Sequence, residues 1–317
     1  FEKEFKFISD KTGKKLIPTI ILYDKKKIFG NDVLNEQNYF KSIFSVKRNF
    51  TKNYETKTFI DENSNKISSL DVSKDFFVYL KDLCETCLKK KVHDCVITVP
   101  AYFDEKARSG IMKAAFMAGL RVKRLINEPT AAAFAYGLEK KKRGIFFVYD
   151  LGGGTFDVSL LKLSEGVFKV IATGGDPNLG GDDLDKLFAE SILNKMLKIE
   201  FDDLSEDEKL KVLKKFKIIK EDFTTCDSKT YDLEINNQNK KVKISIDDLN
   251  DSIESLIEKT IKISTNLINE IDISIKEVSG FVLVGGSSRL KLISKKIQEK
   301  FETKIFNDVN PDLVVSK

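Results

Sequence analysis

Three consecutive glycines at residues 152–154 constrain the fold of this chain more than any other stretch. The apolar run IFFVY leads up to them, and FDVSLLKL, in which apolar and polar residues alternate, follows them. Because alternation is typical of a strand, the chain is extended on both sides, and residues 145–175 are predicted to form an antiparallel meander. G-x-x-x-x-G-K-[ST] loops and G-x-G-x-x-G dinucleotide loops both lead into a helix, so neither pattern fits here.

Two aspartates flank this glycine turn in the sequence DLGGGTFD. Backbone N–H groups in such a turn are open to anionic oxygens because no Cβ blocks them. Asp150 ends a strand of buried character, where a carboxylate is costly without a partner, and magnesium held through water suits it when phosphates lie nearby. Thr155 offers a hydroxyl to a phosphate oxygen. A plain β-turn needs only one glycine, so the sequence favours phosphate contact.

Three further stretches carry weaker signals. LVGGSSR (283–289) is a strand and glycine turn that enters a helix, whose N-terminus favours anions, while its serines and Arg289 also suit a ribose or a base. In LGGDDLD, Asp182 and Asp183 open a helix, and capping explains them as well as ligand binding does. Glu128 follows a strand and either orients an attacking water or is a surface residue in a turn; the residues alone leave both open.

Strands alternate with helices along the rest of the chain, which favours an α/β fold. Asp104 is predicted to cap a helix that Gly119 ends, and Thr130 to cap the next one. The remaining predicted strands are 17–23, 94–103 (buried), a strand and its exit at 121–129, the strand that begins the stretch 278–290, and a hairpin of KTYDLEIN with KKVKISI. Residues 68–90 are predicted to begin with a strand or loop and become an amphipathic helix. The other predicted helices are the stretch from Asp182, 205–223, 247–271 and LKLISKKIQEKF.

Composition excludes several classes of function. The net charge of +5 comes from lysines interleaved with acids, which argues against nucleic-acid binding, and no run of eighteen apolar residues predicts a membrane span. Four cysteines are too few for a disulfide framework and fit a reducing cytoplasm; the C-x-x-C of Cys84 and Cys87 sits in a helical pattern that favours packing over redox or zinc chemistry. A single histidine, His93, excludes Ser-His-Asp catalysis and multi-histidine metal sites.

Six runs, in order along the chain, resemble the nucleotide-binding domain of the seventy-kilodalton heat-shock chaperones: SVKRNF, VITVPAYFDEKAR, RLINEPTAAAFAYGL, VYDLGGGTFDVSLL, ATGGDPNLGGDDLD and LVGGSSRL. The resemblance implies an α/β, actin-like (ribonuclease H-like) ATPase fold with two lobes of two subdomains each around a nucleotide cleft that holds ATP or ADP with Mg2+. Residues 1–143 are expected to form the first lobe and 144–317 the second, with a trimmed upper subdomain at about 183–262 and a return toward the first lobe after 305.

The resemblance also implies roles for individual residues. Asp150 is expected to hold magnesium through water, Glu128 and Asp157 to lie by the attacking water, and Lys47 to reach the γ-phosphate. The catalytic residues implied are Lys47, Glu128, Asp150, Thr155 and Asp157. The nucleotide-binding residues implied are Gly152, Gly153, Gly154 and Thr155 on the phosphates, Lys220, Thr224, Gly285, Gly286, Ser287 and Arg289 around the adenosine side, Asp312 at the base of the cleft, and Gly181.

The sequence departs from the family pattern in two places. The DLGTT-type hairpin that supplies the family's first phosphate loop is not found in the sequence, so we expect a fragment, and the resemblance leaves its own ATPase activity open. In KKFKIIKEDFTT, Lys217 and Glu221 stand where general members place a Glu and an Arg beside the base, and only Lys220 and Thr224 keep their character. Weaker nucleotide affinity is the expected result.

The sequence segment GVFKVIATGGDPNLGGDD and the short upper subdomain resemble the HscA branch, which serves iron–sulfur cluster assembly, more closely than they resemble general DnaK-type folding chaperones. A DnaK-type chaperone remains the alternative. The resemblance implies an ATPase switch that controls client binding, with a J-domain cochaperone and a client, an iron–sulfur scaffold protein, as partners. A metabolite kinase on the same fold is a second hypothesis, against which NEPTAAAFAYG and VPAYF argue. A filament-forming actin relative is a third, and no long apolar patch supports it.

Overall fold

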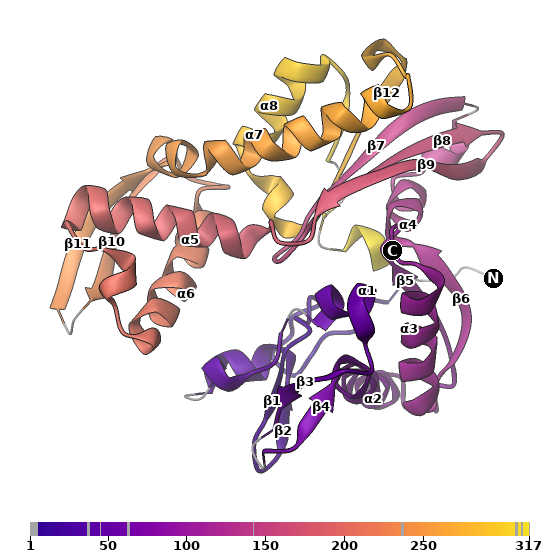
Figure 1. Ribbon diagram of the computed structural model, residues 1–317, viewed down its shortest axis with the longest axis horizontal. Coiled ribbons are helices and arrows are strands. Elements are labelled where there is room, and N and C mark those ends of the chain that lie inside the picture. Colours follow the sequence, from indigo (N-terminus) through magenta and orange to yellow (C-terminus); the bar gives the residue numbers. More distant parts are fainter. Residues whose placement is uncertain are drawn as a thin grey trace. The chain divides into compact units, whose positions relative to one another are not determined.

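The computed structural model describes residues 6–36, 39–44, 46–61, 64–141, 143–235, 238–307, 310–311 and 313–316. The chain divides into two compact units: unit 1 comprises Phe1–Ala131 and Val315–Lys317, and unit 2 comprises Ala132–Val314 (Figure 1). Helices and strands mix within each unit, as an α/β fold requires. The predicted lobe boundary at residue 143 stays a prediction.

Unit 2 is built on a five-stranded sheet in the order β13-β12-β7-β8-β9. The strands β7 (Arg143–Leu151), β8 (Phe156–Ser164) and β9 (Val167–Asp176) form an antiparallel meander, which confirms the prediction for 145–175. The strand β12 (Val278–Val284) runs parallel to β7, and β13 (Ile305–Phe306) runs parallel to β12. Parallel strands end at the same edge of a sheet, so the turns after β7 and β12 are neighbours.

Four long helices and a hairpin complete unit 2: α5 (Gly181–Ile192), α6 (Glu206–Asp222), α7 (Ile246–Glu270), α8 (Lys291–Phe301), β10 (Ser228–Ile235) and β11 (Gln238–Ser245). In Figure 1, α7 runs along the meander, where it packs on β8 and β9, and α8 packs on α7. The helices α5 and α6 pack on each other, and α6 contacts β10. Fully buried aromatic side chains, Tyr149, Phe156, Phe188 and Phe216 among them, join the sheet and these helices into one core.

Unit 1 contains three strand pairs. The strands β1 (Ile21–Tyr23) and β2 (Lys27–Phe29) are antiparallel, as are β3 (Lys57–Ile60) and β4 (Lys66–Ser68), whereas β5 (Asp94–Val99) and β6 (Arg121–Asn127) are parallel. The helices are α1 (Phe50–Asn53), α2 (Ser69–Leu88), α3 (Glu105–Met117) and the start of α4 (Glu128–Ala135), which runs on into unit 2.

Short helical turns lie between these elements. The 3-10 turns are Gly30–Asn35, Tyr39–Lys41, Val46–Asn49, Leu138–Lys140, Phe201–Asp203, Ile275–Glu277, Gly286–Arg289 and Val314–Ser316, and the π-helical turn is Leu193–Leu197.

Helix boundaries follow local chemistry in most cases. The Asp104 side chain accepts the Ala107 N–H at 2.7 Å, so the predicted cap of α3 is confirmed, and Gly119 follows that helix at a φ of +74°. The prediction for α4 was wrong, because the helix begins at Glu128 and Thr130 lies inside its first turn. Pro129 is tolerated there since the first helical N–H groups have no partner within the helix.

Two strand predictions in unit 1 also need correction. The predicted strand 17–23 shrinks to Ile21–Tyr23, because Pro18 has no N–H to donate to a ladder. The predicted buried strand 94–103 ends at Val99, and Val96 is 56% exposed. Among the residues that the structure describes, β5 pairs with β6 alone, so the apolar run is not enclosed on both sides.

Candidate functional site

The glycine turn is the loop that joins β7 to β8 in unit 2. The Gly152 N–H donates to the Thr155 carbonyl oxygen at 3.1 Å, which closes the turn. Asp150 and Asp157 are directly opposite each other in the strand register, so their carboxylates share one face of the sheet. The Thr155 hydroxyl donates to Asp157 Oδ2 at 3.0 Å. Two carboxylates and a hydroxyl therefore lie beside the glycines.

The first turn of α5 holds this loop through the loop's carbonyl groups. The Gly181 N–H donates to the Gly152 carbonyl oxygen at 2.8 Å, and the Asp182 N–H donates to that of Gly153 at 2.7 Å. A Cβ at Gly180 would lie 2.5 Å from the Gly153 oxygen, so only glycine fits there. The Asp183 carboxylate accepts the Gly180 N–H at 2.8 Å, so Asp183 caps the helix, one of the two roles that the sequence left open. The leading amides of α5 therefore bind the loop itself.

The second glycine turn, after β12, packs on the end of β7. Gly285 has a φ of +81°, and a Cβ there would lie 2.4 Å from the Leu151 carbonyl oxygen and 2.7 Å from Asp150 Oδ1. The Ser287 hydroxyl donates to the Gly152 carbonyl oxygen at 3.4 Å. The turn continues as the Gly286–Arg289 3-10 turn into α8, and the exposed Arg289 bonds the Asn310 side chain. The two glycine turns therefore lie side by side at the same edge of the sheet.

Lys220 reaches the same place from α6. This lysine is 5% exposed, and its Nζ donates to the Gly181 carbonyl oxygen at 2.9 Å and pairs with Asp185 Oδ1 at 2.8 Å. Burial raises the pKa of Asp185 to about 6, although the Lys220 ammonium opposes that rise. Thr224, at the end of the same helix, donates its hydroxyl to the Glu221 carbonyl oxygen at 2.8 Å.

Sequence reasoning missed Asp185. A signal was present, because Asp185 falls on the apolar stripe of α5 together with Leu184, Phe188 and Ile192, which are all buried. A carboxylate in such a stripe requires a buried partner.

Unit 1 brings together two predicted residues from distant parts of the sequence. The Lys47 Nζ, in the Val46–Asn49 turn, lies 3.0 Å from Glu128 Oε2 and 3.4 Å from Oε1, at the start of α4. Their side chains are 38% and 19% exposed, so the pair faces solvent in part. The ammonium and the carboxylate are fixed by each other yet remain open to a ligand.

Each set of predicted residues is therefore assembled within its own unit: Lys47 and Glu128 in unit 1, and Asp150, the glycine loop, Thr155, Asp157, Gly181, Lys220 and the second glycine turn in unit 2. Asp312 lies outside the described residues. Magnesium suits the donor set, because carboxylate oxygens are its preferred protein ligands and it keeps several waters. Among the described residues, no group of three or more His, Cys, Asp or Glu side chains could hold a metal ion.

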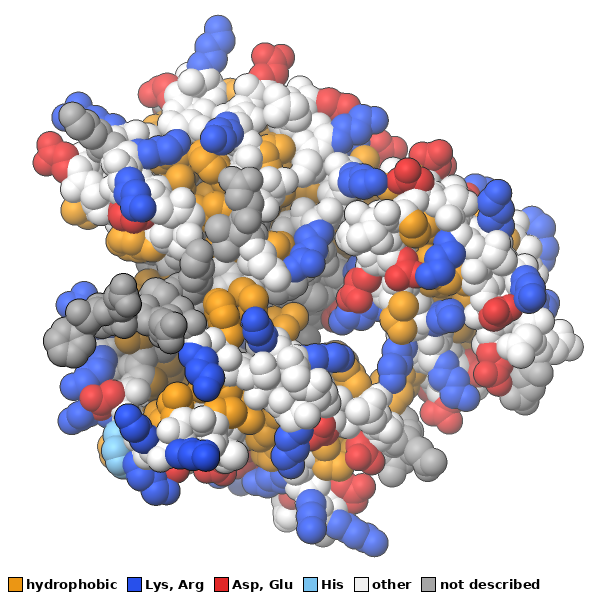
Figure 2. All heavy atoms as spheres, turned by 180° about the vertical axis from the view of Figure 1, so that it is seen from behind, with side chains coloured by type: hydrophobic (Ala, Val, Ile, Leu, Met, Phe, Trp, Pro, Cys, Tyr) orange, Lys and Arg blue, Asp and Glu red, His pale blue; other side chains and the backbone are white. Residues whose placement is uncertain are grey.

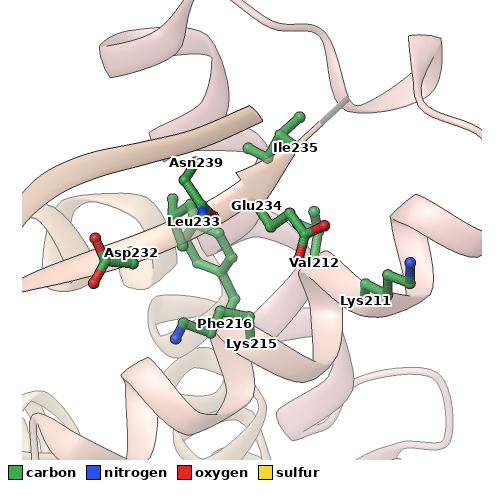
Figure 3. Close-up of a pocket in the computed structure, with 9 residues that line it drawn as sticks. All are labelled: Lys211, Val212, Lys215, Phe216, Asp232, Leu233, Glu234, Ile235 and Asn239. Carbon is green, nitrogen blue, oxygen red and sulfur yellow. The ribbon is translucent and has the colours of Figure 1, made fainter. Parts of the chain in front are cut away.

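Among the described residues, one hollow in unit 2 is lined by none of the predicted site residues. A hollow of about 320 Å³ lies between α6 and the β10–β11 hairpin, with Val212, Phe216, Leu233 and Ile235 buried at its floor (Figure 3). Lysines and acids are interspersed over the face shown in Figure 2. Within the part of the chain that the structure describes, no helix is both long enough and apolar enough to cross a membrane.

The comparison with known families decides the identity of the chain. The family described as Hsp70 protein matches residues 2–317. The chain belongs to the Hsp70 family. This confirms the resemblance seen in the sequence, and the glycine loop, the α5 turn and the Lys47–Glu128 pair are features of an Hsp70-family domain in this chain.

Three similar proteins are HscA chaperones. Chaperone protein HscA of Buchnera aphidicola subsp. Schizaphis graminum is 37% identical over 98% of this chain and 53% of its own length. Chaperone protein HscA of Buchnera aphidicola subsp. Acyrthosiphon pisum (strain Tuc7) is 35% identical over 99% of this chain and 54% of its own. The HscA homolog of Rickettsia prowazekii is 37% identical over 99% and 52%. The Hsp70-family chain thus spans about half the length of these curated relatives.

Proposed function

We propose that this Hsp70-family chain is the ATP-binding and ATP-hydrolysing module of an HscA-like chaperone, with the actin-like arrangement of two lobes around a nucleotide. The observation that carries the proposal is the glycine loop between β7 and β8, flanked by Asp150 and Asp157 and held from behind by the first turn of α5. Membership in the Hsp70 family and similarity to HscA chaperones support it.

In this proposal the loop binds the β- and γ-phosphates of ATP. Residues 152–154 have no side chains, so phosphate oxygens approach the backbone of the loop closely. Asp150 holds magnesium through water, and the ion supplies charge neutralisation at the phosphates when bound. Lys220, Thr224, the Gly285–Ser287 turn and Arg289 form the adenosine side, Asp312 lies at the base of the cleft, and Gly181 also belongs to the nucleotide site. Lys217 and Glu221 replace the family's Glu and Arg there, so nucleotide affinity is expected to be weak.

Hydrolysis converts ATP and water to ADP and phosphate. The Glu128 carboxylate orients the attacking water, and Asp157, which accepts the Thr155 hydroxyl, lies beside it. Lys47 places its ammonium on the γ-phosphate oxygens as negative charge develops there. The contact with Glu128 fixes the position of the Lys47 ammonium before ATP binds. Both residues therefore act on the transition state more than on the binding of ATP.

The alternation of ATP and ADP is proposed to switch client binding in the full-length protein. The two lobes close on ATP and relax after phosphate leaves, and this shift in population controls the client-binding part. A J-domain cochaperone and an iron–sulfur scaffold client are the proposed partners, in the cytoplasm. The similarity to proteins named as HscA chaperones supports the chaperone role.

Replacement of Lys47 by alanine tests the catalytic proposal. In the full-length protein, Lys47→Ala is expected to abolish phosphate release while ATP affinity stays within a few-fold, because the lysine acts on charge that develops during hydrolysis. A phosphate-release assay and calorimetric ATP titration measure the two quantities. Lys113→Ala is the matched control, since Lys113 pairs with Glu55 at 2.7 Å on the surface of the same unit and is expected to leave both unchanged. Normal turnover by Lys47→Ala would defeat the assignment.

A further inference from the structure

A buried ion pair lies directly behind the glycine loop in unit 2. Asp185 and Lys220 are 3% and 5% exposed, and the Lys220 Nζ is 2.8 Å from Asp185 Oδ1. Burying two opposite charges costs solvation that their attraction only partly restores, so such a pair is a weak source of stability. The groups that this pair touches therefore suggest what it does.

The contacts form a continuous path from Asp185 to the loop. The Lys220 Nζ also donates to the Gly181 carbonyl oxygen at 2.9 Å, and the Gly181 N–H donates to the Gly152 carbonyl oxygen at 2.8 Å. Gly181 and Asp185 are one turn apart on α5. The Lys220 ammonium, which comes from α6, therefore contacts both the backbone and a side chain of the same helical turn. The first turn of α5 is thereby fixed from one side by Lys220 and from the other by the loop.

Close packing makes the loop sensitive to the position of that turn. A Cβ at Gly180 would lie 2.5 Å from the Gly153 oxygen, and a Cβ at Gly181 would lie 2.4 Å from Ser287 Oγ and 3.2 Å from Lys220 Nζ. No space separates the turn from its neighbours, so a displacement of the turn is passed on to the loop.

We propose that Asp185 is a positioning residue: its carboxylate holds the Lys220 ammonium on the Gly181 carbonyl, which keeps the first turn of α5 in place against the carbonyl groups of the glycine loop. This inference rests on the proposed function, in which the loop binds the phosphates of ATP. Asp185 acts through Lys220 and through α5, at a distance from the phosphates. Its carboxylate is needed for the geometry of the empty loop as well as for the binding of nucleotide.

Hydrogen exchange without nucleotide tests the geometric part. In the full-length protein, Asp185→Asn is expected to speed exchange at the amides of residues 181–182 by about tenfold, the size of a typical coupling between contacting groups. Asp75→Asn is the matched control, because Asp75 is also buried and pairs with Lys27 at 2.6 Å, but it lies in unit 1. The control is expected to leave exchange at residues 181–182 unchanged. Unchanged exchange in Asp185→Asn overturns the proposal.

A second variant guards against a simple failure to fold. Asp185→Asn leaves a buried ammonium without its counter-ion, whereas Asp185→Asn combined with Lys220→Met removes both charges and restores an apolar interior. The double variant is expected to fold and still to show fast exchange at residues 181–182, because it lacks the Lys220 ammonium that donates to the Gly181 carbonyl oxygen. Slow, wild-type exchange in the folded double variant overturns the proposal.

Nucleotide titration separates this proposal from the proposed function. ADP with magnesium is expected to bind Asp185→Asn, which keeps Lys220, about tenfold more weakly than wild type, while adenosine alone is affected within twofold, because the phosphates contact the loop. Equal losses for ADP and adenosine would mean that the pair serves the nucleoside and would overturn the loop-positioning role. If wild-type protein binds neither ADP nor ATP while Asp185→Asn still speeds exchange, the proposed function fails and the positioning role stands.

Discussion

Two buried aspartates paired with lysine, one in each unit, have pKa values displaced in opposite directions. In unit 2, burial raises the pKa of Asp185 to about 6, with Lys220 as the opposing charge. In unit 1, burial alone would raise the pKa of Asp75, but hydrogen bonds from Lys27 and Lys74 hold it below its usual value, and the Tyr23 hydroxyl also donates to this carboxylate.

The difference arises from the number of donors and from where their charges lie. Lys27 and Lys74 have side chains that are 46% and 31% exposed, so these lysines keep contact with solvent while they bond Asp75. Lys220 is buried with Asp185, so both charges lose their water. The same two residue types therefore form a pair with a partly exposed lysine in one unit and a costly interior link in the other. The interior link is the one beside the glycine loop.

The largest expected effect comes from removing the buried ammonium. Lys220→Ala is expected to lower the free energy of unfolding of unit 2 by roughly 3–5 kcal/mol at pH 7.5, because it leaves the Asp185 carboxylate buried without a counter-charge. Hydrogen exchange of α6 measures the change, with α2 as the internal reference. The loss is expected to shrink at pH 5, where Asp185 takes up a proton. A loss of unfolding free energy below 1 kcal/mol at both pH values would show that the Asp185–Lys220 pair behaves like a solvent-exposed ion pair.

The two aspartates are expected to contribute to stability with opposite dependences on pH. The folded-state pKa of Asp185 lies above its unfolded value, so its contribution to stability is complete below about pH 4 and is lost as the pH rises through about 6, a change on the order of 2–3 kcal/mol. Lys220, Lys217 and Asp182 are the charges that act on it. Asp75 contributes stability above its unfolded pKa that is lost as the pH falls.

Urea denaturation between pH 4.5 and 7.5 measures this difference. Asp185→Asn is expected to abolish the decline in stability between pH 4.5 and 7, and Asp75→Asn is expected to keep it, because that variant leaves Asp185 intact. An unchanged pH profile in Asp185→Asn would contradict the raised pKa.

The smallest effect is expected at the hydroxyl that bonds Asp75. Tyr23→Phe removes a donor at 3.0 Å but leaves both lysines, so the loss of unfolding free energy is expected to be about 1 kcal/mol. The pKa of Asp75 is expected to move upward, since one group that stabilises its charged form is gone. NMR titration of the Asp75 carboxyl carbon checks the direction. A downward movement would mean that the hydroxyl does not donate to the carboxylate.

Much of the site could be predicted from the order of residues. The glycine loop, the meander and the Asp104 cap depend on neighbours in the chain, and all three are present. The family resemblance pointed to Lys47 and Glu128, which the structure places 3.0 Å apart. The exposure of Val96 was not predicted, because a short apolar run has the same pattern whether a sheet covers it on two sides or on one.

The sequence by itself determined where this chain must turn tightly and where a carboxylate would end a strand, since glycine, proline and capping residues act on the backbone within a few positions. Only the tertiary structure decided that the first amides of α5 bind the loop's carbonyl groups and that Asp185 shares Lys220 with Gly181. These contacts join α5 to α6 and to the β7–β8 loop, and their free energies depend on burial, which appears only when the elements pack.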